Sequence, residues 1–126
     1  MNAAIAITAY TKIQKETLSQ EENGYNLVGA ALRKLETNLK ILVSSEVPAS
    51  RSKAFEGILT AIYFLQKSLD LVQGGELAKN LFRLYEFCRL KVLEKGMTKS
   101  RDDHEIKSCH GFILDILKSW DSVKIT

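Results

Sequence analysis

The 126-residue chain has little of the residues that interrupt or staple a fold, since it contains one proline and two cysteines. A single proline leaves few places where a helix must end, which favours a small number of long helices. Two cysteines are too few for a disulfide framework. Cys88 and Cys109 lie among apolar neighbours, where a thiol acts as a small hydrophobic group, so we expect two free buried thiols rather than a disulfide.

The sequence also lacks long apolar runs and a strong charge of one sign. No run approaches the roughly 20 residues that span a bilayer, and the segment AAIAIT near the start lacks the preceding basic residues of a secretory signal. We therefore expect a cytoplasmic protein without membrane insertion. The net charge is +3, and no basic stripe with stacking aromatic residues is present. We therefore expect no nucleic-acid partner.

Four segments repeat apolar residues at alternating spacings of three and four, which is the period of a buried helix face. The predicted buried residues are Tyr25, Val28, Leu32, Leu35, Leu39 and Leu42 in the first segment; Phe55, Ile58, Ile62, Leu65, Leu69 and Val72 in the second; Leu77, Leu81, Leu84, Cys88 and Val92 in the third; and Ile106, Cys109, Ile113, Leu117 and Trp120 in the fourth. No alternation typical of strands competes with this pattern.

The predicted helix boundaries follow from glycine and proline. The first helix is expected from about residue 24 to 44, and Pro48 suits the first position of the second helix. Gly74 is expected to end the second helix at Val72 in a left-handed conformation, with a connection of two or three residues. Gly96 is expected to end the third helix. Ser100 with Asp103 resembles a capping box for the fourth.

Short connections between four such helices predict an all-α fold, an antiparallel up-and-down four-helix bundle. We expect residues 1–126 to form a single domain, with an N-terminal arm over residues 1–20 and the bundle over 21–123. Within the arm, Tyr10 and Ile13 either lie over a binding surface or merely cover the core as part of a frayed terminus.

The sequence contains no arrangement typical of an enzyme. A di-iron site in a bundle needs Glu-x-x-His pairs, and none is present. A structural metal site needs four converging ligands, and we do not expect one from the group that shares the fourth helix, which is Asp102, Asp103, His104, Glu105, Cys109 and His110. Gly74-Gly75 lacks the Lys-Ser/Thr of a phosphate-binding loop. We therefore predict no catalytic residue, no metal and no cofactor.

Two of the expected helices carry a second apolar stripe beside the buried one. It includes Ala61 and Phe64 in the second helix and Ala78, Phe82 and Tyr85 in the third. Such a stripe either closes the bundle against its neighbours or lines a groove for an amphipathic helix of a partner. Periodicity alone does not distinguish these alternatives.

The stretch LDLVQGGELAKNLFRLYEF, residues 69–87, resembles the signature of the flagellar secretion chaperones, the FliS family. The matching positions are Leu69, Asp70, Gly74, Gly75, Glu76, Leu77, Ala78, Asn80, Leu81, Phe82, Leu84, Tyr85 and Phe87. In the arm, Tyr10, Ile13, Glu16 and Thr17 fit the family's Tyr-x-x-Val-x-x-Glu-Thr pattern, with Ile for Val. The likeness is weakest over residues 20–30. There Gln20 replaces a proline, and Gly24 and Gly29 each cost the helix roughly 1 kcal/mol relative to Ala.

The resemblance implies a cytosolic chaperone that binds the disordered C-terminal segment of flagellin, prevents its premature polymerisation and aids its export by the flagellar type III secretion system. It also implies that the loaded chaperone meets the export gate. Together with the stripes, it predicts a partner-binding surface made of Tyr10, Ile13, Ala61, Phe64, Ala78, Phe82 and Tyr85. The alternative is a diverged relative that serves another flagellar export substrate and does not bind flagellin.

Overall fold

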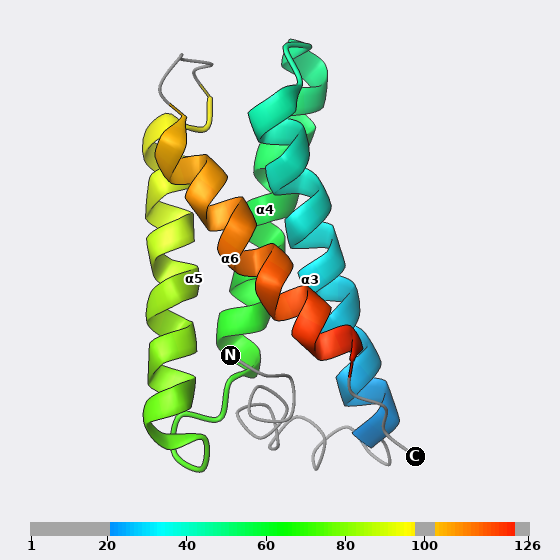
Figure 1. Ribbon diagram of the computed structural model, residues 1–126, viewed down its shortest axis with the longest axis vertical. Coiled ribbons are helices and arrows are strands. Elements are labelled where there is room, and N and C mark those ends of the chain that lie inside the picture. The colour runs from blue at the N-terminus through cyan, green and yellow to red at the C-terminus, as the bar shows by residue number, and fades with distance from the viewer. Residues whose placement is uncertain (1–20, 98–102, 123–126) are drawn as a thin grey trace.

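The computed structural model of the chain describes residues 21–97 and 103–122, with side chains described from Asn26 onward. These residues form four helices: α3 (Glu21–Ser44), α4 (Pro48–Ser68), α5 (Gly75–Lys95) and α6 (His104–Asp121). Successive helices run in opposite directions (Figure 1), so the predicted all-α antiparallel four-helix bundle is confirmed. None of the four is long and apolar enough to cross a membrane.

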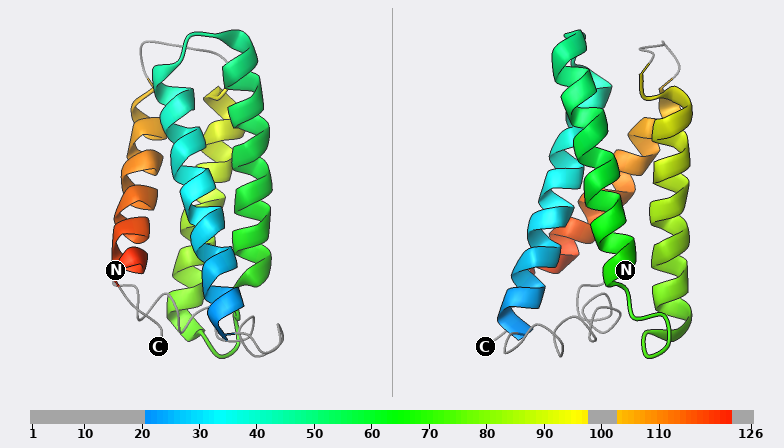
Figure 2. Two further views of the ribbon diagram at one scale, coloured as in Figure 1. Left: turned by 90° about the vertical axis from the view of Figure 1, so that its right-hand side faces the viewer. Right: turned by 180° about the vertical axis from the view of Figure 1, so that it is seen from behind.

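The four helices do not pack equally. α3 makes the most extensive contacts, with α4 on one side and α6 on the other, whereas α5 makes fewer contacts with α4 and α6. Figures 1 and 2 show the reason: α6 runs diagonally, from the upper end of α5 to the lower end of α3. α5 and α6 therefore lie close at the upper end and separate toward the lower end.

The predicted buried faces of α3 and α6 are confirmed for every residue whose side chain is described. These residues are Val28, Leu32, Leu35, Leu39 and Leu42 on α3, and Ile106, Cys109, Ile113, Leu117 and Trp120 on α6. α3 begins at Glu21, earlier than predicted, and continues through Gly29. A Cβ at Gly29 would lie 3.1 Å from Trp120 Nε1. Glycine at this position therefore lets α6 approach α3 closely.

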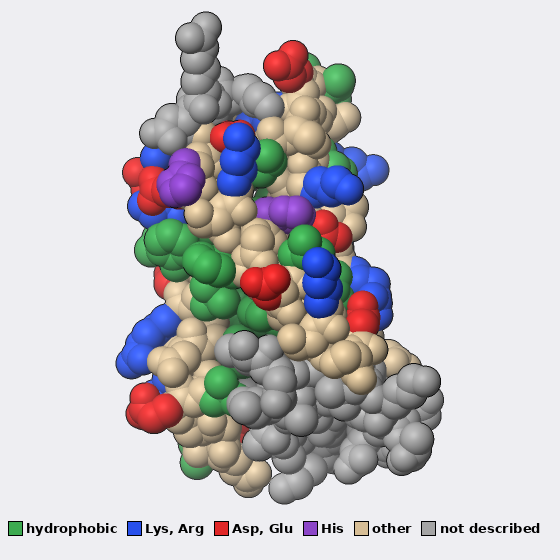
Figure 3. Space-filling view, in the orientation of Figure 1, with side chains coloured by type: hydrophobic (Ala, Val, Ile, Leu, Met, Phe, Trp, Pro, Cys, Tyr) green, Lys and Arg blue, Asp and Glu red, His purple; other side chains and the backbone are tan. Residues whose placement is uncertain are grey.

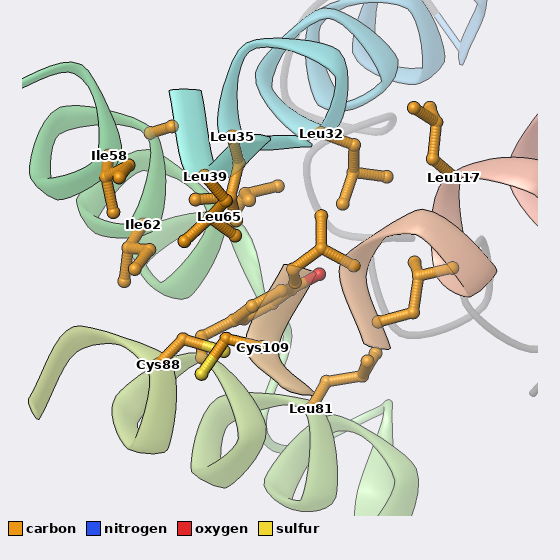
Figure 4. Packing of buried hydrophobic residues seen from close by; sticks show 14 of the residues in the cluster. Leu32, Leu35, Leu39, Ile58, Ile62, Leu65, Leu81, Cys88, Cys109 and Leu117 are labelled. Carbon is orange, nitrogen blue, oxygen red and sulfur yellow. The ribbon is translucent and has the colours of Figure 1, made fainter. Parts of the chain in front are cut away.

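The two thiols meet in the core. Cys88 of α5 and Cys109 of α6 are buried and free, as predicted, and Figure 4 shows their sulfur atoms side by side. The hydrogen bond with Cys109, together with burial, raises the pKa of the Cys88 thiol. A protonated, buried thiol behaves as a small apolar side chain, so this pair belongs to the packing.

The connection between α4 and α5 differs from the prediction. α4 ends at Ser68 rather than at Val72, and residues 69–74 form the connection. The reason is Asp70, whose Oδ1 accepts hydrogen bonds from the backbone N–H groups of Val72 (3.1 Å) and Gln73 (2.9 Å). An Asp side chain that bonds backbone in this way favours a turn over a further helical turn.

The left-handed glycine is also not the predicted one. Gly75 has φ +57°, whereas Gly74 has φ −75° and lies in the right-handed region. The other boundaries agree better. Pro48 is the first residue of α4 and Gly96 caps the end of α5, as predicted. Asp103 is the N-cap of α6 without a side-chain capping bond, and Ser100 lies outside the described residues.

The buried face of α5 is rotated relative to the prediction. Its buried residues are Ala78, Leu81, Tyr85, Cys88 and Val92, which again follow the three-four spacing. Leu77 and Leu84 are only partly buried. The second stripe of the prediction therefore supplies part of the core, and the predicted core face supplies part of the surface. Val72, which was predicted to belong to the buried face of the second helix, lies in the connection after α4 and is 89% exposed.

Arg51 ties the upper end of the bundle together, a role the sequence analysis missed. Its side chain is buried and donates to the carbonyl oxygens of Leu42 and Ser45 (3.2 Å) near the end of α3, and of Gly96 (2.8 Å) at the end of α5. Carbonyls at helix C-termini lack intrahelical partners, and a cation is favourable there. The signal in the sequence was the position of Arg51 in the first turn of α4, where the helix dipole disfavours a positive charge.

Candidate functional site

The structure does not bring the predicted site residues together on one surface. Tyr10 and Ile13 lie outside the described residues. Phe64 is partly buried against the core, and Phe82 is 36% exposed. The other three are core residues no more than 3% exposed: Ala61, Ala78 and Tyr85. Direct contact between a partner and these three would require a helix to move, so the predicted partner-binding roles stay predictions.

Large hydrophobic side chains are nevertheless exposed at several places on the described surface. They are Leu27, Val47, Tyr63, Leu71, Val72, Phe82, Phe87, Leu90, Leu93, Met97 and Phe112. Single exposed hydrophobic residues are ordinary, but clusters of them mark interaction sites. α5 carries more of these residues than any other described helix, and it is also a helix with few packing contacts. The candidate surfaces therefore lie on the two sides of α5.

The first candidate is an apolar hollow between α5 and α6, in the region where the two helices separate. It is lined by Leu84 from α5 and by Phe112, Asp115 and Ile116 from α6, and we call these four residues the α5–α6 groove. Phe112 is 46% exposed, whereas Ile116 is buried and forms the floor. Figure 3 shows hydrophobic side chains gathered over the middle of α5 and α6.

The volume of this hollow, about 170 Å³, is well below the roughly 300–1,000 Å³ of a small-molecule pocket. A hollow of that size suits individual side chains of a larger partner. The described residues also hold no group of three or more His, Cys, Asp or Glu side chains that could bind a metal. The surface is therefore suited to recognition of apolar side chains.

Charged pairs close the upper end of the groove. Glu105 of α6 binds Lys91 Nζ at 2.8 Å and Lys95 Nζ at 2.6 Å, both from α5. The hydrogen bonds with Lys91 and Lys95 lower the pKa of Glu105 to about 2. These ion pairs hold the upper ends of α5 and α6 together, so the groove opens only toward the lower end.

α6 is attached to α3 on its other side. His110 Nε2 lies 2.7 Å from Glu36 Oε2, and the guanidinium of Arg33 binds both carboxylate oxygens of Asp121 at 2.7 and 2.8 Å. His110 therefore helps to hold α6 against α3. With α6 attached to α3 along its length, the position of α5 sets the width of the groove.

The second candidate lies on the opposite side of α5, beside the α4–α5 connection. It is lined by Leu71, Lys79, Phe82 and Arg83, and we call these four residues the Phe82 hollow. Residues two apart on a helix point about 200° apart, so Phe82 faces away from the side that carries Leu84. On the Phe82 side, Gln66 of α4 donates to the Phe82 carbonyl oxygen at 3.3 Å.

Glu86 joins α4 and α5 near this second candidate. It accepts hydrogen bonds from Gln66 Nε2 at 3.1 Å and from Arg89 at 2.9 and 2.5 Å. The bonds with Arg89 and Gln66 lower the pKa of Glu86 to about 2. The carboxylate is therefore used within the protein, and it does not add an available negative charge to the surface beside Phe82.

Comparisons with known proteins agree on one family. The family model described as "Flagellar protein FliS" matches residues 2–126. The chain is also 27% identical over 129 aligned residues to the "Flagellar secretion chaperone FliSB" of Pseudomonas aeruginosa, and the alignment covers 98% of each chain. No solved structure matches the chain.

Proposed function

Because the chain belongs to the FliS family of flagellar proteins, we propose that it is an export chaperone that binds the disordered C-terminal segment of flagellin in the α5–α6 groove. The observation that carries this proposal is an apolar hollow with a half-exposed Phe112 and a buried Ile116. It lies between two helices that separate toward one end. The similarity of the whole chain to a relative named as a flagellar secretion chaperone supports the chaperone role.

The geometry suits an amphipathic helix laid into the groove. Side chains of such a helix at spacings of three and four would enter between Leu84 and Phe112 and rest on Ile116. Burial of apolar surface offsets the entropy lost when a disordered segment becomes helical. The same burial removes from water the apolar residues through which flagellin subunits associate, so the bound subunit stays monomeric.

Release follows from the same energetics. A segment that folds on binding spends part of its interaction energy on becoming ordered, so its affinity per buried area is modest. Binding through apolar contacts alone requires no nucleotide in this mechanism. Contact between the loaded chaperone and the export gate, which the family resemblance implies, would use surfaces outside the groove.

The proposal is tested with three ligands: full-length flagellin, flagellin without its C-terminal segment, and that segment as a peptide. We expect the chaperone to bind the first and the third and not the second in calorimetric titrations. We also expect helicity measured by circular dichroism to exceed the sum of the separate components. Equal binding of the truncated flagellin would place the recognised segment elsewhere, and no binding of any form would favour the alternative of another export substrate.

A further inference from the structure

The connection between α4 and α5 is an ordered turn. Asp70 is buried and its Oδ1 accepts hydrogen bonds from the N–H groups of Val72 and Gln73, while its carbonyl oxygen accepts from Gly74 N–H at 2.8 Å. Gly75, with φ +57°, then starts α5. Each of these bonds stabilises one conformation of the turn.

This ordered turn holds apolar side chains in water. Val72 is 89% exposed and Leu71 is 44% exposed, and Phe82, which lines the same hollow as Leu71, is 36% exposed. The hydrogen bonds of Asp70 stabilise the turn in the conformation that leaves Leu71 and Val72 exposed. Exposed apolar side chains on a pre-organised segment lose little conformational entropy when a partner covers them, which favours binding at this place.

The charges around the Phe82 hollow have one dominant sign. Lys79 and Arg83 line this hollow together with Leu71 and Phe82, and the volume of the hollow is about 210 Å³. The pairing of Lys79 with Glu76 is long, 3.6 Å, between side chains that are 52% and 78% exposed, and such pairs contribute little. Arg83 bonds the neutral amide oxygen of Asn80 at 3.0 Å, and the carboxylate of Asp70 is directed at the turn's own amides.

We propose that the Phe82 hollow is a second docking surface, which binds an acidic amphipathic segment of a partner protein. An aromatic or branched aliphatic side chain of that segment packs between Leu71 and Phe82. Asp or Glu side chains next to it in the sequence pair with Lys79 and Arg83. The surface goes beyond the proposed function, because it lies on the side of α5 opposite the α5–α6 groove. Both surfaces can therefore be occupied at the same time.

The test uses the full chain and two fluorescein-labelled amphipathic peptides with the same leucine and phenylalanine positions, one flanked by glutamate and the other by lysine. In fluorescence anisotropy titrations we expect the glutamate peptide to bind more tightly than the lysine peptide, and we expect its binding to be weaker at about 500 mM salt than at about 50 mM because exposed ion pairs are screened. The double variant Lys79→Glu, Arg83→Glu should lose at least about tenfold in affinity for the glutamate peptide and gain affinity for the lysine peptide.

The matched control is Lys40→Glu, Lys118→Glu, which makes the same change in net charge at exposed positions on α3 and α6 and should bind like the wild type. Phe82→Ser should weaken binding of the glutamate peptide without lowering helicity. Equal binding of both peptides, an equal effect of both double variants, or no binding of the glutamate peptide at about 1 mM overturns the proposal. A dimer in sedimentation analysis that Lys79→Glu, Arg83→Glu dissociates also overturns it, in favour of a second copy of this chain.

Discussion

Replacing Phe112 by aspartate is the most direct test of the α5–α6 groove. In the unbound protein Phe112 is 46% exposed, and it lies beside Asp115 in the groove. Complete burial of a Phe side chain contributes about 1.5–3 kcal/mol, so burial of its exposed part by a partner is worth roughly 0.7–1.4 kcal/mol. The aspartate loses this contribution, and its carboxylate must also be buried without a partner, which costs about 1–3 kcal/mol more.

The two effects add to roughly 2–4 kcal/mol, or about a 30- to 700-fold loss of affinity at 1.4 kcal/mol per decade. The same substitution should leave the unbound protein folded, because the new carboxylate reaches water. The unbound variant loses only the contacts of the buried part of the Phe112 ring, which lowers its free energy of unfolding by about 1–1.5 kcal/mol. Titration with the flagellin C-terminal peptide measures the affinity, and thermal unfolding by circular dichroism measures the stability.

Phe82→Asp is the matched control, since it makes the same change at a similarly exposed Phe, 36% exposed, on the opposite side of α5. We expect this variant to bind the flagellin peptide with near wild-type affinity. If Phe112→Asp stays folded and binds like the wild type, the groove is not the binding surface. If Phe82→Asp alone abolishes binding, the surface predicted from the sequence around Phe82 receives flagellin instead.

Three further predictions concern the fold that supports the groove. Arg51→Met leaves three carbonyl groups without their charged donor and should lower the free energy of unfolding by about 2–4 kcal/mol. The control Arg33→Met, at an exposed ion pair, should lower it by less than about 1 kcal/mol. Equal losses for the two variants in urea titrations would contradict the role of Arg51. Gly75→Ala should lower the free energy of unfolding by about 1–2 kcal/mol because the backbone at Gly75 is left-handed, whereas Gly74→Ala should be tolerated. If Gly74→Ala lowered stability more than Gly75→Ala did, Gly75 would not be the left-handed residue of the turn. Since the pKa of Glu105 is lowered from 4.5 to about 2, its contribution to stability is complete above pH 4.5 and is lost as the pH falls toward 2. Glu105→Gln should therefore be less stable than the wild type at neutral pH, with a difference that shrinks over this range in unfolding curves, and a difference independent of pH would refute the ion pairs with Lys91 and Lys95.

Some features of the connection between α4 and α5 were readable in the sequence and others were not. The Gly-Gly pair correctly located the break between helices. The choice between Gly74 and Gly75, and the early end of α4 at Ser68, depended on which backbone groups Asp70 would bond. An aspartate near the end of a helix has several possible partners within a few residues. Residue type alone therefore did not decide the outcome.

The candidate site was the least predictable part. Phe112 was not among the predicted site residues, and Leu84 was expected in the core. Arg51 gave no periodic signal, because its partners, the carbonyls of Leu42 and Gly96, come from two other helices. Features that depend on contacts between distant segments are not contained in local periodicity.

The sequence by itself determined the four helices, their antiparallel order and the buried faces of α3 and α6, because a three-four apolar repeat and short connections are local properties of the chain. Only the tertiary structure decided which side of α5 is buried. Leu77, Leu81 and Leu84 compete there with Ala78, Leu81 and Tyr85, and both sets fit the helical period. Packing against α4 and α6 selected the second set. The close approach of α6 to α3 at Gly29 and Trp120 accompanies the diagonal course of α6, and the separation of α6 from α5 left Leu84 and Phe112 to line a groove.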